Sequence, residues 1–313
     1  MLLGRTANGL YWMSRYIERA ENMARLVDAG LRLALTRTET SADEWHSVVV
    51  SAGAENAFAS RHQTYSADNV ADFLLRDTSN PSSVLSSVET ARSNARMVRT
   101  ALTREVWESI NDAWMTCRRI LASPIDQREL PKILDAVKRE TALIRGALHG
   151  TMLRNEIFDF AQLGIYVERA DNTARILDVK YYVLLPSVSW VGSSLDNYQW
   201  ESILRSVSAH RSYRWVYEAD YKPTNIADFL ILNRRMPRSL AFCYRMIAES
   251  LTFLADDYGE RHDCHQTLEE ILSKLRPGTI DAVFDIGLHE FLGDFIHRNN
   301  TLGDEVAQNY RFF

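Results

Sequence analysis

The chain has 313 residues, 46% of them hydrophobic and 25% charged, which is the composition of a soluble globular protein with two domains or one large double-layered bundle. The formal net charge of −5 and the lack of a basic tail argue against nucleic acid as a partner. Glycine (13) and proline (7) are sparse for this length, so we expect an all-α protein built from long helices.

Helix start signals occur along the whole chain. Ser41 and Glu44 form a capping-box pattern, and Asn69 and Asn225 each precede an aspartate by three residues, which predicts an N-cap at both asparagines. Pro81 suits the first turn of a helix. The expected helices cover residues 8–37, 41–62, 69–76, 81–100, 103–122 and 131–150, followed by a comparable series from residue 156.

The chain contains nearly the same helix twice. Residues 16–28 (YIERAENMARLVD) recur as residues 166–178 (YVERADNTARILD), and residues 69–75 (NVADFLL) recur as residues 225–231 (NIADFLI). The intervening segments align at Trp45 with Trp200, Ser51 with Ser206 and Phe58 with Tyr213, and the strand-like segment 47–50 is expected to be helical because it aligns with 202–205. We therefore predict a tandem duplicated helical bundle, with repeats at 1–152 and 153–313 related by a pseudo-two-fold axis.

The repeated helix has a polar face that a helix with one buried side does not need. At 100° per residue, Glu18, Asn22 and Arg25 fall within about 80° of one another, and Arg15 and Glu21 lie nearby. The corresponding residues of the second copy, Glu168, Asn172 and Arg175, lie on a more apolar helix. We therefore expect the polar residues to be partly buried.

Arg19 projects away from this polar face, between Trp12 and Leu26. Its guanidinium either stacks on the indole or is partly buried beside a carboxylate. If the motif helices of the two repeats face each other, the glutamate of one copy meets an arginine of the other. Arg169 is in the same position in the second copy.

Three functions fit this duplicated cluster. It is a salt-bridged seam between the repeats, a receptor that grips a carboxylate or phosphate through arginine forks, or the site of an enzyme that uses Glu18 or Glu168 as a general base or metal ligand. The candidate ligand- or partner-binding residues are Glu18, Arg19, Asn22, Arg25, Glu168, Arg169, Asn172 and Arg175.

Other polar groups carry weaker signals. Arg92, Arg96 and Arg99 form a basic ridge that is either a solvated helix face or an anion site, and Arg234, Arg235 and Arg238 form a local basic group able to hold one anion. His262, Cys264 and His265 lack a complete set of metal ligands and fit a flexible loop, and a carboxylate-bridged metal bundle would need repeated Glu-x-x-His pairs that the chain lacks. We expect no metal and no cofactor, and no nucleotide-binding motif occurs.

Cysteine usage and hydropathy bear on location. The three cysteines are odd in number and far apart, which argues against a disulfide framework. Charged residues interrupt the N-terminal segment before an export signal forms, and no stretch approaches the roughly 20 apolar residues of a membrane span. A cytoplasmic protein without a membrane partner is expected.

The motifs together resemble one known family. The Glu-Arg dipeptide within residues 16–25, the Asn-Gly-Leu-Tyr-Trp segment at 8–12, residues 91–96 (ARSNAR) and the second Glu-Arg at 168–169 look like the bacterial alpha-E family, and the resemblance spans essentially the full chain. Members of that family are typically encoded beside, or fused to, ATP-grasp proteins resembling amide ligases, often with a transglutaminase-like protease nearby. The resemblance implies an accessory part of a peptide-modifying or amide-bond-forming system, and it supplies no established catalytic residue.

Overall fold

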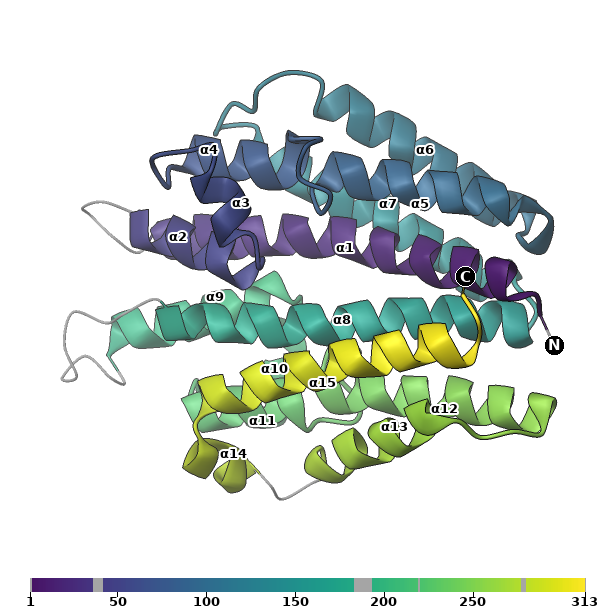
Figure 1. Ribbon diagram of the computed structural model, residues 1–313. Coiled ribbons are helices and arrows are strands. Elements are labelled where there is room, and N and C mark those ends of the chain that lie inside the picture. Colours follow the sequence, from purple (N-terminus) through teal and green to yellow (C-terminus); the bar gives the residue numbers. More distant parts are fainter. Residues whose placement is uncertain (1, 36–41, 183–192, 219, 277–279, 313) are drawn as a thin grey trace.

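The computed structural model describes residues 2–35, 42–182, 193–218, 220–276 and 280–312, and these residues form helices and connecting turns without strands (Figure 1). The first half contains α1 (Gly4–Ala34), α2 (Ala42–Ser51), α3 (Glu55–Ala59), α4 (Ala67–Ala71), a π-helical turn (Asp72–Arg76), α5 (Val84–Met97), a 3₁₀ turn (Arg99–Ala101), α6 (Arg104–Ile120) and α7 (Leu130–Thr151). The second half contains α8 (Glu156–Tyr182), α9 (Ser194–Ser206), α10 (His210–Tyr217), α11 (Pro223–Ile231), α12 (Leu240–Tyr258), α13 (Asp263–Lys274), α14 (Ile280–Ile286) and α15 (Leu288–Asn309).

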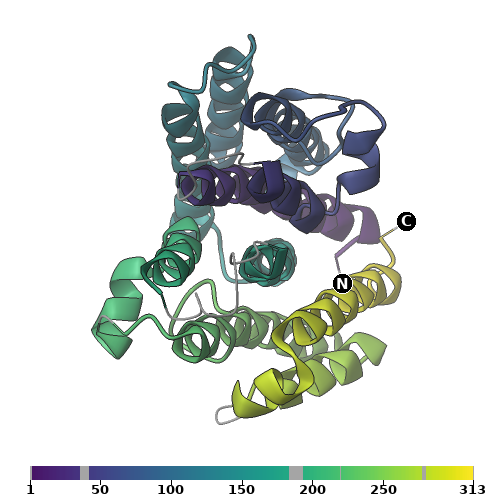
Figure 2. The same ribbon diagram turned by 90° about the vertical axis from the view of Figure 1, so that its left-hand side faces the viewer.

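The two motif helices, α1 and α8, lie side by side at the centre of the molecule (Figures 1 and 2). They run parallel, with Tyr11 beside Gly164 near their beginnings and Arg19 beside Glu168 further along. A Cβ at Gly164 would collide with the Tyr11 carbonyl oxygen, so glycine is what allows the two backbones to approach. This contact sets the distance across which the charged side chains of the two helices meet.

The remaining helices cover the central pair from opposite sides. Helices α5 and α7 pack on α1, with α6 outside them, whereas α12 and α15 pack on α8, with α13 outside them (Figure 1). One continuous hydrophobic cluster runs through both halves. The aligned aromatic positions lie within it: Trp45, Phe58, Trp200 and Tyr213 are all buried. The all-α prediction is confirmed by the described residues.

Several predicted helix boundaries are wrong. The expected helix at 41–62 breaks at Gly53, whose φ of +67° is left-handed, and α2 ends before it. Segment 47–50 lies in α2 and is helical, as predicted. Ser41 lies outside the described residues, so the capping box at Ser41 and Glu44 stays a prediction.

Asn69 and Asn225 are not N-caps. Asn69 lies inside α4, whose N-cap is Ser66, and the Ser66 hydroxyl accepts a hydrogen bond from the Asn69 backbone N–H at 3.2 Å. Asn225 lies in α11, which begins at Pro223. The Ser66 hydroxyl thus caps α4 three residues before Asn69, whereas α11 follows Lys222 and has a proline in its first turn.

Helices α5 and α12 begin in the same way. Pro81 lies in a turn rather than in the first helical turn, and Ser83 is the N-cap of α5, accepting from the Ser86 amide at 3.2 Å. Ser239 caps α12 in the same manner, with 3.0 Å to the Phe242 amide. Each half therefore has a Pro-x-Ser segment leading into the helix that covers the motif helix.

The division into repeats at 1–152 and 153–313 and the pseudo-two-fold axis stay predictions, because nothing in the fold separates the halves into independent units. None of the helices among the described residues is long and apolar enough to span a membrane.

Candidate functional site

The central helices exchange their Glu-Arg pairs. Arg19 of α1 donates two hydrogen bonds to the Glu168 carboxylate, at 2.6 and 3.0 Å. Arg169 of α8 donates two to Glu18, at 2.7 and 3.2 Å. The expectation that the glutamate of one copy meets an arginine of the other is therefore confirmed, and Arg19 is held by a carboxylate rather than by the indole of Trp12.

A second pair of equivalent contacts joins the motif helices to the opposite half. Arg25 donates to the backbone carbonyl of Ser206 at 2.6 Å, and Arg175 donates to that of Ser51 at 3.2 Å. Ser51 and Ser206 are themselves aligned positions in the two repeats. The motif arginines thus satisfy the carbonyl ends of α2 and α9, where helices leave unpaired acceptors.

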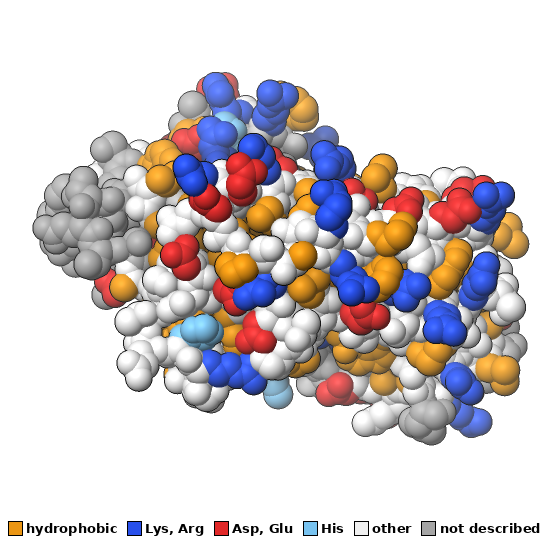
Figure 3. Space-filling view, turned by 90° about the horizontal axis from the view of Figure 1, so that it is seen from above, with side chains coloured by type: hydrophobic (Ala, Val, Ile, Leu, Met, Phe, Trp, Pro, Cys, Tyr) orange, Lys and Arg blue, Asp and Glu red, His pale blue; other side chains and the backbone are white. Residues whose placement is uncertain are grey.

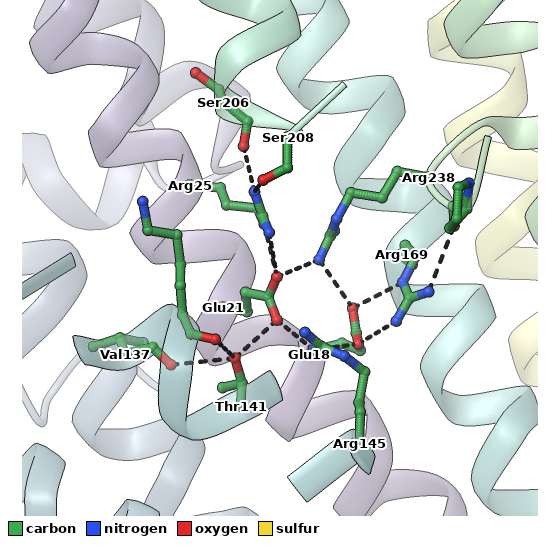
Figure 4. A network of polar contacts seen from close by, with 12 residues as sticks. Glu18, Glu21, Arg25, Val137, Thr141, Arg145, Arg169, Ser206, Ser208 and Arg238 are labelled. Atoms are coloured by element: carbon green, nitrogen blue, oxygen red, sulfur yellow. Dashed lines mark hydrogen bonds and ion pairs between the residues drawn. The ribbon is translucent and has the colours of Figure 1, made fainter. Parts of the chain in front are cut away.

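The Glu18 cluster is a buried charge network that joins α1 to α7, to α8 and to the segment before α12 (Figure 4). Glu18 is fully buried and accepts from Arg169 and from Arg145 of α7, the latter at 2.8 Å. The neighbouring Glu21 is bonded by Arg25, Arg145, Arg238 and the Thr141 hydroxyl, the last at 2.8 Å. The cluster therefore comprises Glu18, Glu21, Arg25, Arg145, Arg169 and Arg238, which is two carboxylates for four guanidinium groups.

This excess of positive charge fixes the ionisation of the Glu18 cluster. Burial opposes ionisation of the two glutamates, but the arginines outweigh it and lower the pKa of Glu18 and, more strongly, that of Glu21. Burial and the neighbouring Arg25 lower the pKa of Arg238 to about 9, so its guanidinium remains charged at neutral pH. Within the Glu18 cluster, chain residues satisfy both carboxylates completely.

The Glu168 cluster lies on the other side of the α1–α8 contact and comprises Glu168, Asp171, Arg15, Arg19, Arg175, Asn22 and Asn172. Arg15 donates to Glu168 at 2.8 Å, beside the two hydrogen bonds from Arg19. Burial opposes ionisation of Glu168, but Arg19 and Arg15 together lower its pKa to about 2. Arg175 binds Asp171 of its own helix at 2.6 and 3.3 Å.

A cavity of about 190 Å³ opens beside the Glu168 cluster. This is far more than the roughly 10–15 Å³ that one water needs on the same measure. The lining residues are Arg15, Arg19, Asn22, Met23, Ala52, Ser82, Glu168, Asp171, Asn172, Arg175 and Asn300. Three guanidinium groups face two carboxylates there, so the cavity carries one net positive charge.

Two asparagines bring unused hydrogen-bonding capacity to this cavity. Asn22 donates to the Glu168 carbonyl at 3.2 Å, and its own side-chain oxygen has no partner. Asn172 is only 2% exposed, and neither its amide nitrogen nor its oxygen has a partner among the residues described. A buried amide without partners is costly in a folded protein, which makes Asn172 a candidate ligand contact.

The structure regroups the predicted residues. Glu18 and Arg25 lie in the Glu18 cluster, whereas Asn22 lies at the cavity, so the predicted polar trio is divided between two networks. Seven of the eight candidate residues nevertheless lie at the α1–α8 contact or its cavity, whereas Arg25 bonds Glu21 of its own helix and the Ser206 carbonyl. Arg145 and Thr141 were missed because α7 lies outside the repeated motif, and Arg238, expected to hold an anion, holds Glu21 of the same chain.

The basic ridge does not form one helical face. Helix α5 ends at Met97, so Arg99 lies beyond it. Arg92 and Arg99 lie over Trp114 and Trp107 at 4.1 and 5.2 Å, which stabilises the contact between α5 and α6. Arg96 is exposed. The face seen from above mixes basic, acidic and hydrophobic side chains rather than showing a single-sign field (Figure 3).

The histidine and cysteine candidates are structural. His262 and His265 form a capping box at the start of α13, so the expectation of a flexible loop there is wrong. The buried His265 ring also bonds the Leu251 carbonyl at 3.1 Å. Among the described ranges, no group of three or more His, Cys, Asp or Glu side chains is placed to hold a metal ion.

The architecture is thus an all-helical unit built around a buried pair of Glu-Arg motifs, and the sequence comparisons agree with this class. Residues 2–311 match the Alpha-E family, described as a predicted alpha-helical domain with a conserved ER motif, and the chain belongs to that family. Glu-Arg dipeptides of this chain form the exchanged ion pairs between α1 and α8.

The similar curated proteins are long and carry no stated function. Uncharacterised proteins of Mycobacterium bovis and of Mycobacterium tuberculosis strain CDC 1551 are each 22% identical over 93% of this chain, and one of M. tuberculosis strain H37Rv is 21% identical. The chain spans only 35% of the length of each relative. No solved structure matches.

Proposed function

We propose that this protein is an accessory helical component of a bacterial peptide-modifying or amide-bond-forming system. In this proposal it acts with an ATP-grasp-type amide ligase, in some settings beside a transglutaminase-like protease. The duplicated Glu/Arg/Asn cluster binds the partner or a carboxylate-bearing peptide. The observation that carries the proposal is the net positive charge that the Glu168 cluster presents to an open cavity.

The family and its relatives support this role. An amide ligase acts on a carboxylate, and arginine forks are the protein groups best shaped to hold one. About two thirds of each curated relative lies outside the matched region, which is the size relation expected if this helical unit works joined to other domains.

The ionisation of the motif glutamates favours binding over catalysis. A general base works best with a pKa near the operating pH, and the pKa of Glu168 is about 2. Every oxygen of Glu18 and Glu168 already accepts a hydrogen bond from an arginine. A metal ion would have to displace these guanidinium groups before either glutamate served as a ligand.

Co-expression with an ATP-grasp protein encoded beside a family member tests the proposal. The expected result is co-purification of the two proteins and loss of amide-bond formation when this chain is omitted. A Glu18→Gln, Glu168→Gln double variant keeps shape but removes the charges that hold Arg169 and Arg19 in position, and in folded form it should lose activity because these arginines are no longer oriented. Full activity of the folded double variant, or failure of the two proteins to bind, contradicts the proposal and leaves the cluster as a structural seam.

A further inference from the structure

We infer that only the Glu168 cluster receives a ligand, and that this ligand is the carboxylate end of a peptide. The inference rests on the proposed function for the identity of the ligand as a peptide. Its physical basis is a difference in what fills the Glu18 cluster and the Glu168 cluster, which otherwise contain equivalent Glu-Arg pairs.

One side chain accounts for most of that difference. In the Glu18 cluster, Arg238 enters between the carboxylates, bonding Glu21 and approaching Glu18 to 3.9 Å. Arg238 follows Pro237 in the Pro-x-Ser segment that leads into α12. The residue in the same position before α5, after Pro81, is Ser82, and Ser82 lines the cavity. A long cationic side chain thus fills the first network, and a short hydroxyl leaves room in the second.

A second arginine keeps the Glu168 carboxylate neutralised without Arg238. This second arginine, Arg15 of α1, lies beside Gly303 of α15. Arg15 joins Arg19 on Glu168 as Arg145 joins Arg169 on Glu18. Both carboxylates at the cavity are already paired with arginines, so they do not attract an entering cation. An anion, in contrast, is attracted by the net positive charge of the lining residues.

The free hydrogen-bonding atoms match a peptide terminus. Among the described residues, Arg15 Nη2 and Arg19 Nη1 take no part in the hydrogen bonds that hold Glu168, so both are available to a carboxylate. Asn172 supplies one unpartnered donor group and one unpartnered acceptor, which suits the C=O and N–H of the adjoining peptide unit. A single net positive charge suits a carboxylate better than phosphate, which carries about −1.5 to −2 at neutral pH.

Calorimetric titration of the purified chain with N-acetylglycine tests the inference. N-acetylglycinamide, the uncharged analogue, should bind about 10-fold to 100-fold more weakly, the range expected for losing a charge-assisted hydrogen bond. Ser82→Arg, which copies the arrangement at Arg238, should abolish binding while the protein stays folded. Ser273→Arg adds the same charge at an exposed position of α13 and should leave the affinity unchanged.

Asn172→Leu provides a second variant that does not depend on filling the cavity. It should weaken binding of N-acetylglycine without lowering the melting temperature, since Asn172 has no hydrogen bond to lose among the described residues. Equal binding of the amide analogue, tighter binding of inorganic phosphate, binding of methylguanidine instead, or unchanged binding by Ser82→Arg overturns the inference.

The two proposals fail separately. If the chain binds N-acetylglycine but forms no complex with an ATP-grasp ligase, the proposed function is contradicted and the carboxylate site is supported. Suppose instead that the natural chain binds no N-acetylglycine and that the ligase complex forms equally well with Ser82→Arg. This result would contradict the carboxylate site but would be consistent with the proposed function.

Discussion

Replacing Glu18 by glutamine should destabilise the protein strongly. Glu18 is fully buried, and its carboxylate is bonded by Arg169 and Arg145. Glutamine keeps the size and part of the hydrogen bonding but removes the charge, so two buried guanidinium groups lose their shared counter-ion. Breaking a buried ion pair from one side costs about 3–5 kcal/mol, because the remaining charge stays desolvated.

The expected shift in melting temperature follows from chain length. An unfolding entropy of about 2.1 cal/mol/K per residue gives roughly 0.66 kcal/mol/K for this chain, so Glu18→Gln should lower the midpoint by about 5–8 °C. The matched control is Glu249→Gln, which removes an i, i+4 partner of Arg245 whose side chains are 55% and 44% exposed. An exposed pair of this kind contributes under about 1 kcal/mol, so the control should shift by less than about 1.5 °C.

Differential scanning calorimetry of both variants at neutral pH gives the comparison directly. The Glu18→Gln variant also makes Arg238 more unfavourable, because the Glu18 cluster then holds four guanidinium groups against one carboxylate. Arg238→Met should therefore cost less stability in the Glu18→Gln background than in the natural chain. Equal midpoints for Glu18→Gln and Glu249→Gln would refute the idea that the Glu18 cluster is electrostatically coupled and buried.

Three further predictions concern pH, hydrogen bonding and thiol access. The pKa of Glu168 falls from 4.5 to about 2 on folding, so its stabilising contribution is complete above pH 4.5 and is lost as the pH falls towards 2; urea unfolding across this range should show a shallower pH dependence for Glu168→Gln. Asn299→Leu breaks the bonds to Tyr244 and Val167 and should cost about 2–5 kcal/mol in urea unfolding, whereas Asn172→Leu should be neutral or stabilising. All three cysteines are free and buried, and burial raises the pKa of each thiol to about 12, so a thiol reagent should label them rapidly only in denaturant.

The repetition of the motif was enough to predict the exchanged ion pairs. A Glu-Arg dipeptide places its two side chains about 100° apart on a helix, so two such helices in contact can satisfy each other's charges. The sequence also indicated that Arg19 points away from Glu18, and in the structure Arg19 crosses to Glu168. The position of Arg19 on one helix gives the direction of its side chain, and the second copy of the helix provides the carboxylate of Glu168 in that direction.

The residues that complete the networks could not be predicted in the same way. Arg145 comes from α7, which has no motif, and Arg15 reaches Glu168 in the space beside Gly303. Such contacts depend on packing between helices distant in sequence, where periodicity carries no information. The sequence does differ between Pro81-Ser82 and Pro237-Arg238. This difference indicates an open cavity only once the structure places Ser82 at the cavity and Arg238 beside Glu21.

The most direct test of the carboxylate site is the side-chain NMR spectrum of the isotopically labelled chain during titration with N-acetylglycine. The Asn172 amide resonance, assigned through Asn172→Leu, and the Nε resonances of Arg15 and Arg19 should shift with N-acetylglycine and stay in place with N-acetylglycinamide. The shifts should be absent in Ser82→Arg. Unchanged Asn172 and arginine resonances at saturating N-acetylglycine would contradict the account.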